Sequence, residues 1–206
     1  MQPLHRDDWL FVVNKPPGLL SQPGLGSDQQ DSVITRLQQQ ESNLRLVHRL
    51  DRDTSGVLLL ARSLSSLRRF SELFARRQIR KLYVADVEGR LNGGGRIAFP
   101  LARLQSHPPR YGAHPDGRSA LTRWRVRKLQ EGRTRLWLFP LTGRSHQLRA
   151  HLAGIGHPIV GDPIYGIAAA GRMQLHALSL AFVHPFTGQR MRVHSQDLNP
   201  CPVSLS

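Results

Sequence analysis

Short apolar, β-prone runs alternate along the chain with polar loops that are rich in turn-forming residues. Residues 9–13 are apolar, and residues 14–18 (NKPPG) end this run with a Pro-Gly pair that suits a type II turn. A second apolar run of strand length, residues 57–61, comes directly after the polar residues 49–56. The pattern predicts an N-terminal strand and turn, and a charged loop that leads into a buried strand.

Three helices are predicted from capping residues followed by apolar positions at helical spacing. The first begins after Asp31 or Ser32, the second after Ser63 or Ser65, and the third after Ser145. The apolar positions that mark one face of each helix are Val33, Ile34 and Leu37 in the first, Leu67, Phe70, Leu73 and Phe74 in the second, and Leu148, Leu152 and Ile155 in the third.

Five further segments are predicted to form strands, over residues 82–87, 120–126, 134–139, 175–183 and 189–194. Residues 92–95 are expected to form a loop. Residues 105–119 contain three Pro and two Gly, and we expect a long surface loop there that can carry function. Because the strands come in runs rather than in strict alternation with helices, the fold class indicated is α+β.

The composition indicates one compact unit with a polyanionic partner. A chain of 206 residues with 39% hydrophobic content can enclose a sizeable core, so we expect residues 1–206 to form a single domain. Lys and Arg number 29 against 14 Asp and Glu, a formal net charge of +15. Arg outnumbers Lys among these cations, and a preference for Arg codons explains that excess as well as a binding role does. It does not explain the net charge. The net charge favours nucleic acid as the partner, and the guanidinium group of Arg can donate hydrogen bonds to two phosphate oxygens at once.

The sequence also indicates a compartment. Its single cysteine, Cys201, excludes an internal disulfide and a cysteine-based zinc site. It has no apolar run of 18 residues, and its first eight residues lack the apolar core of a signal peptide. We therefore expect a soluble protein of the cytoplasm that makes no membrane contact.

Several signatures of other enzyme classes are missing from the sequence. There is no GxxxxGK phosphate loop, no strand-GxGxxG-helix unit and no HExxH pair. His146 and His151 lie five residues apart, which turns them to different faces of the predicted helix, and no acidic residue joins them at ligand spacing. We expect no metal site, which argues against a metal-dependent nuclease. His146 is either a structural histidine or an RNA contact.

The polar loop before the second strand holds two aspartates, Asp51 and Asp53. Asp51 stands between Arg49 and Arg52, so we expect its carboxylate to stay ionised and to be available as a nucleophile or as a stabiliser of positive charge. From the spacing alone, either aspartate fits an Asx turn, and we assign that role to Asp53. The spacing leaves the role of Asp51 open.

Residues 48–56 (HRLDRDTSG) resemble the signature of the RluA-type pseudouridine synthases. The other segments that resemble motifs of this family, in order, are residues 14–19 (NKPPGL), 81–85 (KLYVA), 142–149 (TGRSHQLR), 156–162 (GHPIVGD) and 175–177 (LHA). The resemblance covers nearly the whole chain, from residue 9 to about residue 194. It implies the pseudouridine synthase fold, in which a mixed, largely antiparallel central sheet with flanking helices carries a cleft between two lobes.

The resemblance also implies roles for individual residues. Asp51 matches the catalytic aspartate, Tyr83 the tyrosine that lies against the target uracil and assists proton removal, and Arg149 the arginine that pairs with the aspartate. Arg49 approaches either the flipped nucleotide or the place that it vacates. The other residues that we expect to bind RNA are Arg144, His146 and the cluster Arg76, Arg77, Arg80 and Lys81, whose charges also complement the dipole of the second predicted helix.

The activity implied is the isomerisation of uridine to pseudouridine in structured RNA, which needs no cofactor. No S4 RNA-binding domain is expected before the first motif. The member of the family that this short chain most resembles has large-subunit rRNA and tRNA anticodon stem-loops among its substrates. The alternatives are a synthase restricted to tRNA and a non-catalytic RNA-binding protein on the same fold. We expect a monomer.

Overall fold

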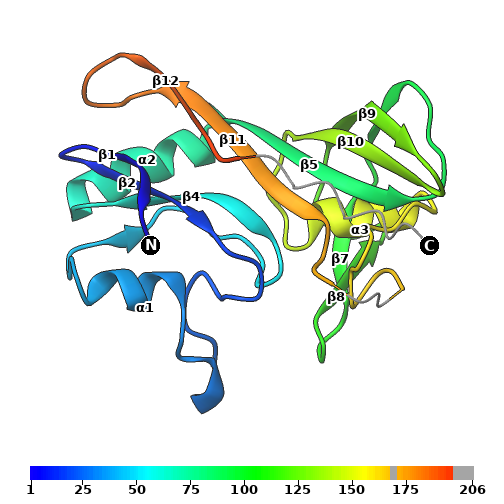
Figure 1. Ribbon diagram of the computed structural model, residues 1–206, viewed down its shortest axis with the longest axis horizontal. Helices are drawn as coiled ribbons and strands as arrows, with labels where there is room; N and C mark the ends of the chain where they lie inside the picture. The colour runs from blue at the N-terminus through cyan, green and yellow to red at the C-terminus, as the bar shows by residue number, and fades with distance from the viewer. Residues whose placement is uncertain (168–170, 197–206) are drawn as a thin grey trace.

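The computed structural model describes residues 1–167 and 171–196, and most of its strands form one twisted sheet. The strand order is β1-β2-β4-β11-β5-β10-β9-β6, with β12 paired to β11 and β3 to β4. The bounds are β1 (Pro3–Arg6), β2 (Leu10–Lys15), β3 (Arg45–Leu46), β4 (Ser55–Ala61), β5 (Arg80–Glu88), β6 (Gly94–Ile97), β9 (Thr122–Gln130), β10 (Arg133–Pro140), β11 (Leu175–Val183) and β12 (Arg190–His194). Figure 1 shows β11 returning beside β5 in the middle of the molecule, where it joins the N-terminal strands to the later ones.

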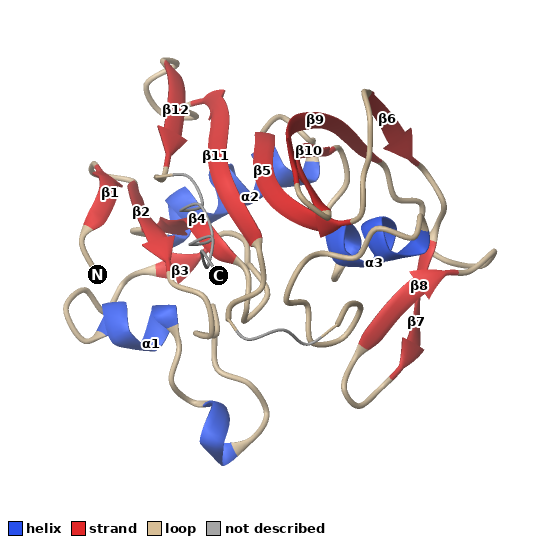
Figure 2. Cartoon of the chain, turned by 45° about the vertical axis from the view of Figure 1, so that its right-hand side comes forward, coloured by secondary structure: helices blue, strands red, loops and turns tan. Residues whose placement is uncertain are grey.

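Helices cover the sheet because its strands are apolar on the faces that they meet. The helices are α1 (Val33–Gln38), α2 (Leu64–Ala75) and α3 (Gln147–Gly154), with a short 3-10 turn at Ser27–Gln29 (Figure 2). In β4, Leu58 and Leu60 pack with α1, whereas Val57 and Leu59 pack with Phe70 of α2. This strand is buried on both faces, which explains its unbroken apolar run.

Gly56 is required where β4 meets β11, the parallel pair of the sheet. It lies at φ +115°, and a Cβ atom at this position would stand 2.2 Å from the carbonyl oxygen of Ala177. Only glycine tolerates both this backbone conformation and this approach. The last residue of the 48–56 motif therefore brings the loop that contains Asp51 against the central strand.

The fold class predicted from the pattern is confirmed, as are the seven strands and three helices predicted from it. All strand pairs other than β4–β11 are antiparallel. Of the alternative caps, Ser32 and Ser63 accept the hydrogen bonds at the starts of α1 and α2. None of the described helices is long and apolar enough to cross a membrane.

Three local predictions were wrong. Residues 105–119 are not one loop, because β7 (Leu101–Gln105) and β8 (Arg110–Ala113) form a hairpin with the two prolines in its turn. This hairpin is ordered by tertiary contacts, including the hydroxyl of Tyr165, which accepts from the amide of Tyr111 at 2.7 Å. Residues 94–95 belong to β6, which pairs with β9. Ser145 does not cap α3.

Candidate active site

The motif residues meet around a cavity of about 240 Å³. Asp51 comes from the loop before β4, Tyr83 from β5, and Arg149 from α3. The side chain of Asp51 is 30% exposed, so a substrate in the cavity can reach its carboxylate. Residues that lie far apart in the sequence therefore share one solvent-accessible site.

Arg149 connects two carboxylates. Its Nη1 lies 3.4 Å from Oδ2 of Asp51, a long hydrogen bond, whereas its Nε and Nη2 donate to the two oxygens of Asp162 at 2.7 and 2.8 Å. Burial opposes the charge of Arg149, but its hydrogen bonds to Asp162 and the charges of Asp162 and Asp51 raise the pKa of the guanidinium above its ordinary value. The bidentate pair fixes the plane of the guanidinium and aims its remaining edge at Asp51.

Asp162 was not predicted from the sequence as a site residue. Its side chain is completely buried, and Oδ1 also accepts from the amides of Ile164 and Tyr165. A buried carboxylate persists only when it is paired, so Asp162 and Arg149 must be considered as one unit. In the sequence, Asp162 could have been recognised as the acidic residue that ends the 156–162 motif, after an apolar pair and a glycine.

His146 lies beside the carboxylate of Asp51. Its Nε2 is 3.9 Å from Oδ2 of Asp51, and its Nδ1 is 3.1 Å from the hydroxyl of Tyr165. It occupies the N-cap position of α3 at φ 50°, and its side chain makes no capping hydrogen bond there. Burial lowers the pKa of His146, an effect that the charge of Asp51 partly offsets. The imidazole is therefore part of the Asp51 cluster.

Gln147 replaces the expected serine cap in holding the turn before α3. Its side-chain oxygen accepts from the amide of Arg144 at 3.0 Å and from the hydroxyl of Thr142 at 2.7 Å. Its nitrogen donates to the carbonyl of Leu121 and to Thr122. This one buried amide places both Arg144 and His146 at the rim of the cavity.

Tyr83 presents a neutral phenol to the cavity. Burial, and then the negative charge of Asp51, raise the pKa of its hydroxyl well above the ordinary value. The ring packs against the core clusters on both sides of the cavity. At neutral pH this residue can offer an aromatic surface and a hydroxyl group, but not a phenolate.

Lys15 and Ser21, which the sequence did not single out, hold the loop that contains Asp51. The completely buried ammonium of Lys15 donates to the carbonyls of Pro16, Leu19 and Arg52 at 2.9, 2.6 and 2.7 Å. The hydroxyl of Ser21 donates to the carbonyl of Leu50 and accepts from its amide. In the sequence, the available signal was a lysine at the end of a strand that begins with four apolar residues.

Replacing Lys15 by Met is expected to lower the free energy of unfolding by about 2–3 kcal/mol, because three carbonyls, of which that of Leu19 is buried, lose their donor. Turnover is expected to fall as well, since the backbone beside Asp51 loses its anchor. Urea unfolding and an activity assay measure the two effects. Lys128→Met, at an exposed position, is the matched control. Equal stability of the two variants would contradict this role of Lys15.

His48 is held neutral at the edge of the cavity. Its Nε2 accepts from the amide of Leu59 at 3.1 Å, and its ring lies 4.7 Å from that of Phe74. Burial, and then the charge of Lys81, lower the pKa of His48 from 6.5 to about 3. Protonation would break the hydrogen bond to Leu59.

This shift predicts a pH dependence of stability. Between pH 6.5 and about 3 the unfolded chain binds a proton at His48 that the folded chain does not. The free energy of unfolding therefore falls as the pH drops through this window, by up to about 1.4 kcal/mol per pH unit. The free energies of unfolding of the wild type and of His48→Gln, measured from pH 7 to pH 4, test this dependence. The variant should show the shallower slope, and identical slopes would refute the assignment.

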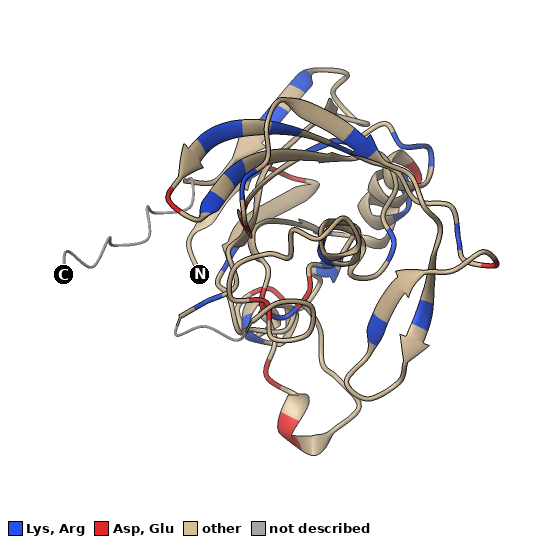
Figure 3. Cartoon of the chain, turned by 90° about the vertical axis from the view of Figure 1, so that its right-hand side faces the viewer, with Lys and Arg blue, Asp and Glu red and all other residues tan. Residues whose placement is uncertain are grey.

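The predicted RNA-binding residues differ in their surroundings. Arg49 and Arg144 line the cavity and are exposed or half-buried, whereas the ammonium of Lys81 donates to the carbonyl of Thr142 at 2.9 Å. Arg76 forms an ion pair with Glu72 at 2.6 Å. Arg77 and Arg80 line the neighbouring surface. Figure 3 shows Lys and Arg spread over many elements, with few acidic residues between them.

Within residues 1–167 and 171–196, no group of three or more His, Cys, Asp or Glu residues could hold a metal ion. His151, on the opposite side of α3 from the cavity, is within hydrogen-bonding distance of Thr122 and of the carbonyl of Phe99. Cys201 lies outside the described residues.

Comparison with known proteins identifies the family. A family model described as RNA pseudouridylate synthase matches residues 9–154. The chain belongs to this family. As an RNA pseudouridylate synthase it is an isomerase that modifies RNA, in agreement with the resemblance of its motifs.

Its relatives in the family match over most of their length. The chain is 42% identical to the dual-specificity RNA pseudouridine synthase RluA of Yersinia pestis, covering 91% of this chain and 95% of the relative. The protein of the same name from Escherichia coli strain K12 is 40% identical, with 91% and 89% covered. Among solved structures, human RNA pseudouridylate synthase domain containing 1 is 27% identical, with a TM-score of 0.80 and 95% and 83% covered. The predicted RluA-type assignment is therefore confirmed.

Proposed function

We propose that this synthase isomerises specific uridines in large-subunit rRNA and in tRNA anticodon stem-loops, with Asp51 as the catalytic carboxylate. One observation carries the assignment. Asp51 is the carboxylate that faces the open cavity, and Arg149, His146 and Tyr83 surround it there. The dual specificity named for the Yersinia pestis and Escherichia coli relatives supports two classes of RNA.

The reaction suits a single carboxylate without a redox partner. The bond from ribose C1′ to uracil N1 breaks, the uracil turns, C5 joins C1′, the C5 hydrogen leaves as a proton, and the freed N1 takes up a proton. An ionised carboxylate beside C1′ stabilises positive charge there or bonds to it, as in glycosidases. Attack on C6 of the base and removal of the C2′ proton are alternative roles for the same group. Each of them needs the carboxylate form of Asp51, which accepts a long hydrogen bond of 3.4 Å from Nη1 of Arg149.

The residues around Asp51 take distinct roles in this proposal. Tyr83 stacks on the uracil, and its neutral hydroxyl assists the loss of the C5 proton through a hydrogen bond. Arg149 positions the carboxylate. His146, neutral because of its burial, fills the space between Asp51 and Tyr165 and limits the access of water.

The uridine must leave its stacked loop to reach Asp51. Extrusion of a nucleotide is unfavourable by a few kcal/mol, and stacking on Tyr83 and phosphate contacts from arginines offset this. In this proposal Arg49, which is exposed and lines the cavity two residues before Asp51, occupies the position that the base vacates. Arg144, on the opposite rim, contacts the phosphate of the flipped nucleotide.

Primer extension after carbodiimide treatment tests the proposed substrates. RNA from cells with and without the gene is compared, because the adduct on pseudouridine stops reverse transcriptase. We expect stops in large-subunit rRNA and in tRNA anticodon loops that disappear without the gene. Loss of the tRNA stops alone would indicate a synthase restricted to tRNA. No change in either RNA would overturn the substrate assignment.

We further propose that the protein acts in the cytoplasm as a monomeric single domain of two lobes around the cavity. The substrates are RNAs of the translation machinery, and Asp51, Tyr83 and Arg149 of one chain line the same cavity. Sedimentation at micromolar concentration should give the mass of one chain, and a dimer would contradict the monomer.

A further inference from the structure

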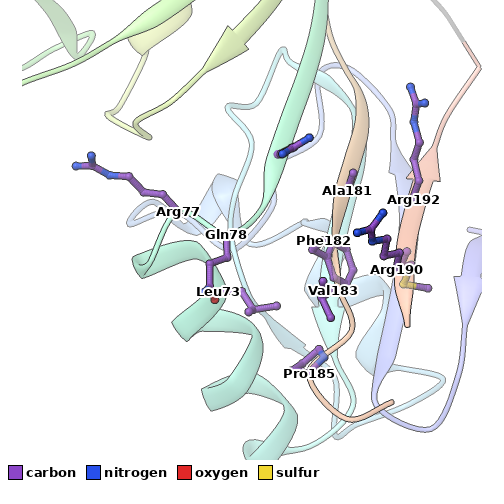
Figure 4. Close-up of a pocket in the computed structure, with 11 residues that line it drawn as sticks. Leu73, Arg77, Gln78, Ala181, Phe182, Val183, Pro185, Arg190 and Arg192 are labelled. Atoms are coloured by element: carbon purple, nitrogen blue, oxygen red, sulfur yellow. The ribbon is translucent and has the colours of Figure 1, made fainter. Parts of the chain in front are cut away.

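A second concave surface lies beside the end of α2, away from Asp51. Its volume is about 910 Å³, and four arginines surround it: Arg77, Arg80, Arg190 and Arg192. Figure 4 shows Arg77 at the end of α2 on one side and Arg190 and Arg192 on β12 on the other, with β11 between them. We call this surface the arginine groove and define it by these four residues.

Strand register places three of the four guanidinium groups on one face. Ala181 of β11 pairs with Arg80 of β5 on one side and with Arg192 of β12 on the other. Residues opposite each other on neighbouring strands point to the same face of a sheet. Arg190, two residues before Arg192, shares that face by the alternation of a strand. The small side chain of Ala181 leaves a hollow between the arginines.

The charge of the arginine groove is not neutralised within the described protein. None of the residues that line it is acidic. Among the described residues, none of its four guanidinium groups has an ion pair or a side-chain hydrogen bond. By contrast, the neighbouring Arg76 is paired with Glu72. Four cations in one hollow repel one another, and a bound polyanion relieves this repulsion.

The arginine groove is connected to the active site by shared residues. Arg77 and Arg80 also line a second hollow, of about 1090 Å³, whose wall includes Lys81 and Arg144. Lys81 and Arg144 in turn line the cavity that contains Asp51. A basic path therefore runs from Asp51 past the end of α2 to β12.

We propose that the arginine groove binds the phosphate backbone of the RNA outside the stem-loop that carries the target uridine. The inference rests on the proposed function and adds Arg190 and Arg192 as residues that set affinity for long substrates. Guanidinium groups bind phosphate oxygens in pairs, and an extended basic path suits a chain of phosphates better than one small anion. Contacts of this kind position RNA and carry no sequence information.

Binding of two RNAs by the double variant Arg190→Glu, Arg192→Glu tests the proposal. The probes are a full-length substrate tRNA and its isolated anticodon stem-loop. For the full-length tRNA, we expect Kd to rise at least about tenfold and the slope of log Kd against log salt to fall by about 2. For the stem-loop, Kd should stay within about twofold of wild type. The kcat should not change with either RNA, because the groove lies outside the catalytic cavity.

The control is Arg45→Glu, Arg90→Glu, which makes the same charge change at exposed positions that do not line the groove. It should leave the affinity for both RNAs near wild type. If the test variant bound full-length tRNA with unchanged affinity, the proposal would be overturned. That result is expected if the groove binds an acidic protein instead of RNA. Equal weakening with both RNAs would also overturn it. Pseudouridine formation by the wild type is measured separately. A failure of the proposed function can therefore be distinguished from a failure of the proposed role of the groove.

Discussion

Replacing Asp51 by Asn is expected to lower pseudouridine formation at least about 10⁴-fold, while RNA still binds with a Kd near that of wild type. The amide is almost the same size as the carboxylate, but it carries no charge to stabilise C1′ and is a poor nucleophile and base. Release of tritium from RNA labelled at uridine C5 measures turnover, because the C5 hydrogen is lost when C5 joins C1′. Filter binding gives the Kd.

Asp53→Asn is the matched control, since it removes one negative charge two residues away. Asp53 forms an ion pair with its neighbour Arg52 at 3.1 Å, and it does not line the cavity. This variant should retain turnover within about tenfold of wild type. Turnover by Asp51→Asn at a similar level would show that another group performs the chemistry.

Replacing Asp162 by Asn is expected to lower the free energy of unfolding by about 3–5 kcal/mol, because the buried guanidinium of Arg149 loses its counter-charge. Turnover should fall together with stability, since Arg149 is then no longer held toward Asp51. We expect the loss in kcat, with a smaller change in KM, because Asp162 is buried and cannot contact RNA. Urea unfolding and steady-state kinetics, at temperatures where the variant stays folded, separate the two effects.

The chain contains a matched control for this variant as well. Asp86 and Arg135 form a second buried bidentate pair, at 2.7 and 2.8 Å, and neither residue lines the cavity. Asp86→Asn should therefore lower stability by a similar amount but leave kcat unchanged. If both variants lost kcat equally, the effect of Asp162 would be one of stability alone.

The residues around Asp51 were predicted from the sequence only in part. The resemblance named Asp51, Tyr83 and Arg149, and the fold brings all three to one cavity. It did not reveal that Arg149 makes its shorter hydrogen bonds with Asp162. Nor did it assign a role to Lys15, whose bond to the carbonyl of Arg52 spans 37 positions in the sequence. Such contacts depend on the relative placement of elements, which local spacing does not specify.

Errors in the predicted elements have a similar origin. Residues 57–61 and 175–183 were recognised because apolar runs, unbroken in the first segment and interrupted by His176 and Ser179 in the second, are typical of buried strands. The hairpin of β7 and β8 was missed because its residues are mostly exposed and include two prolines in the turn. Its order comes from packing against α3 and from Tyr165, which lies some 50 residues later.

The sequence by itself determined the fold class, the main strands and helices and the basic character, and it predicted Asp51 as the reacting carboxylate. Each of these follows from local periodicity, total charge or an ordered set of motifs. Only the tertiary structure decided which groups restrain that carboxylate and which arginines share one groove. The pairing of Arg149 with Asp51 spans 98 positions, and Arg80 and Arg192 share a face only through the register of three strands. Hydrogen bonds and charge interactions act over a few ångströms, so their partners are set by the folded backbone and not by distance along the chain.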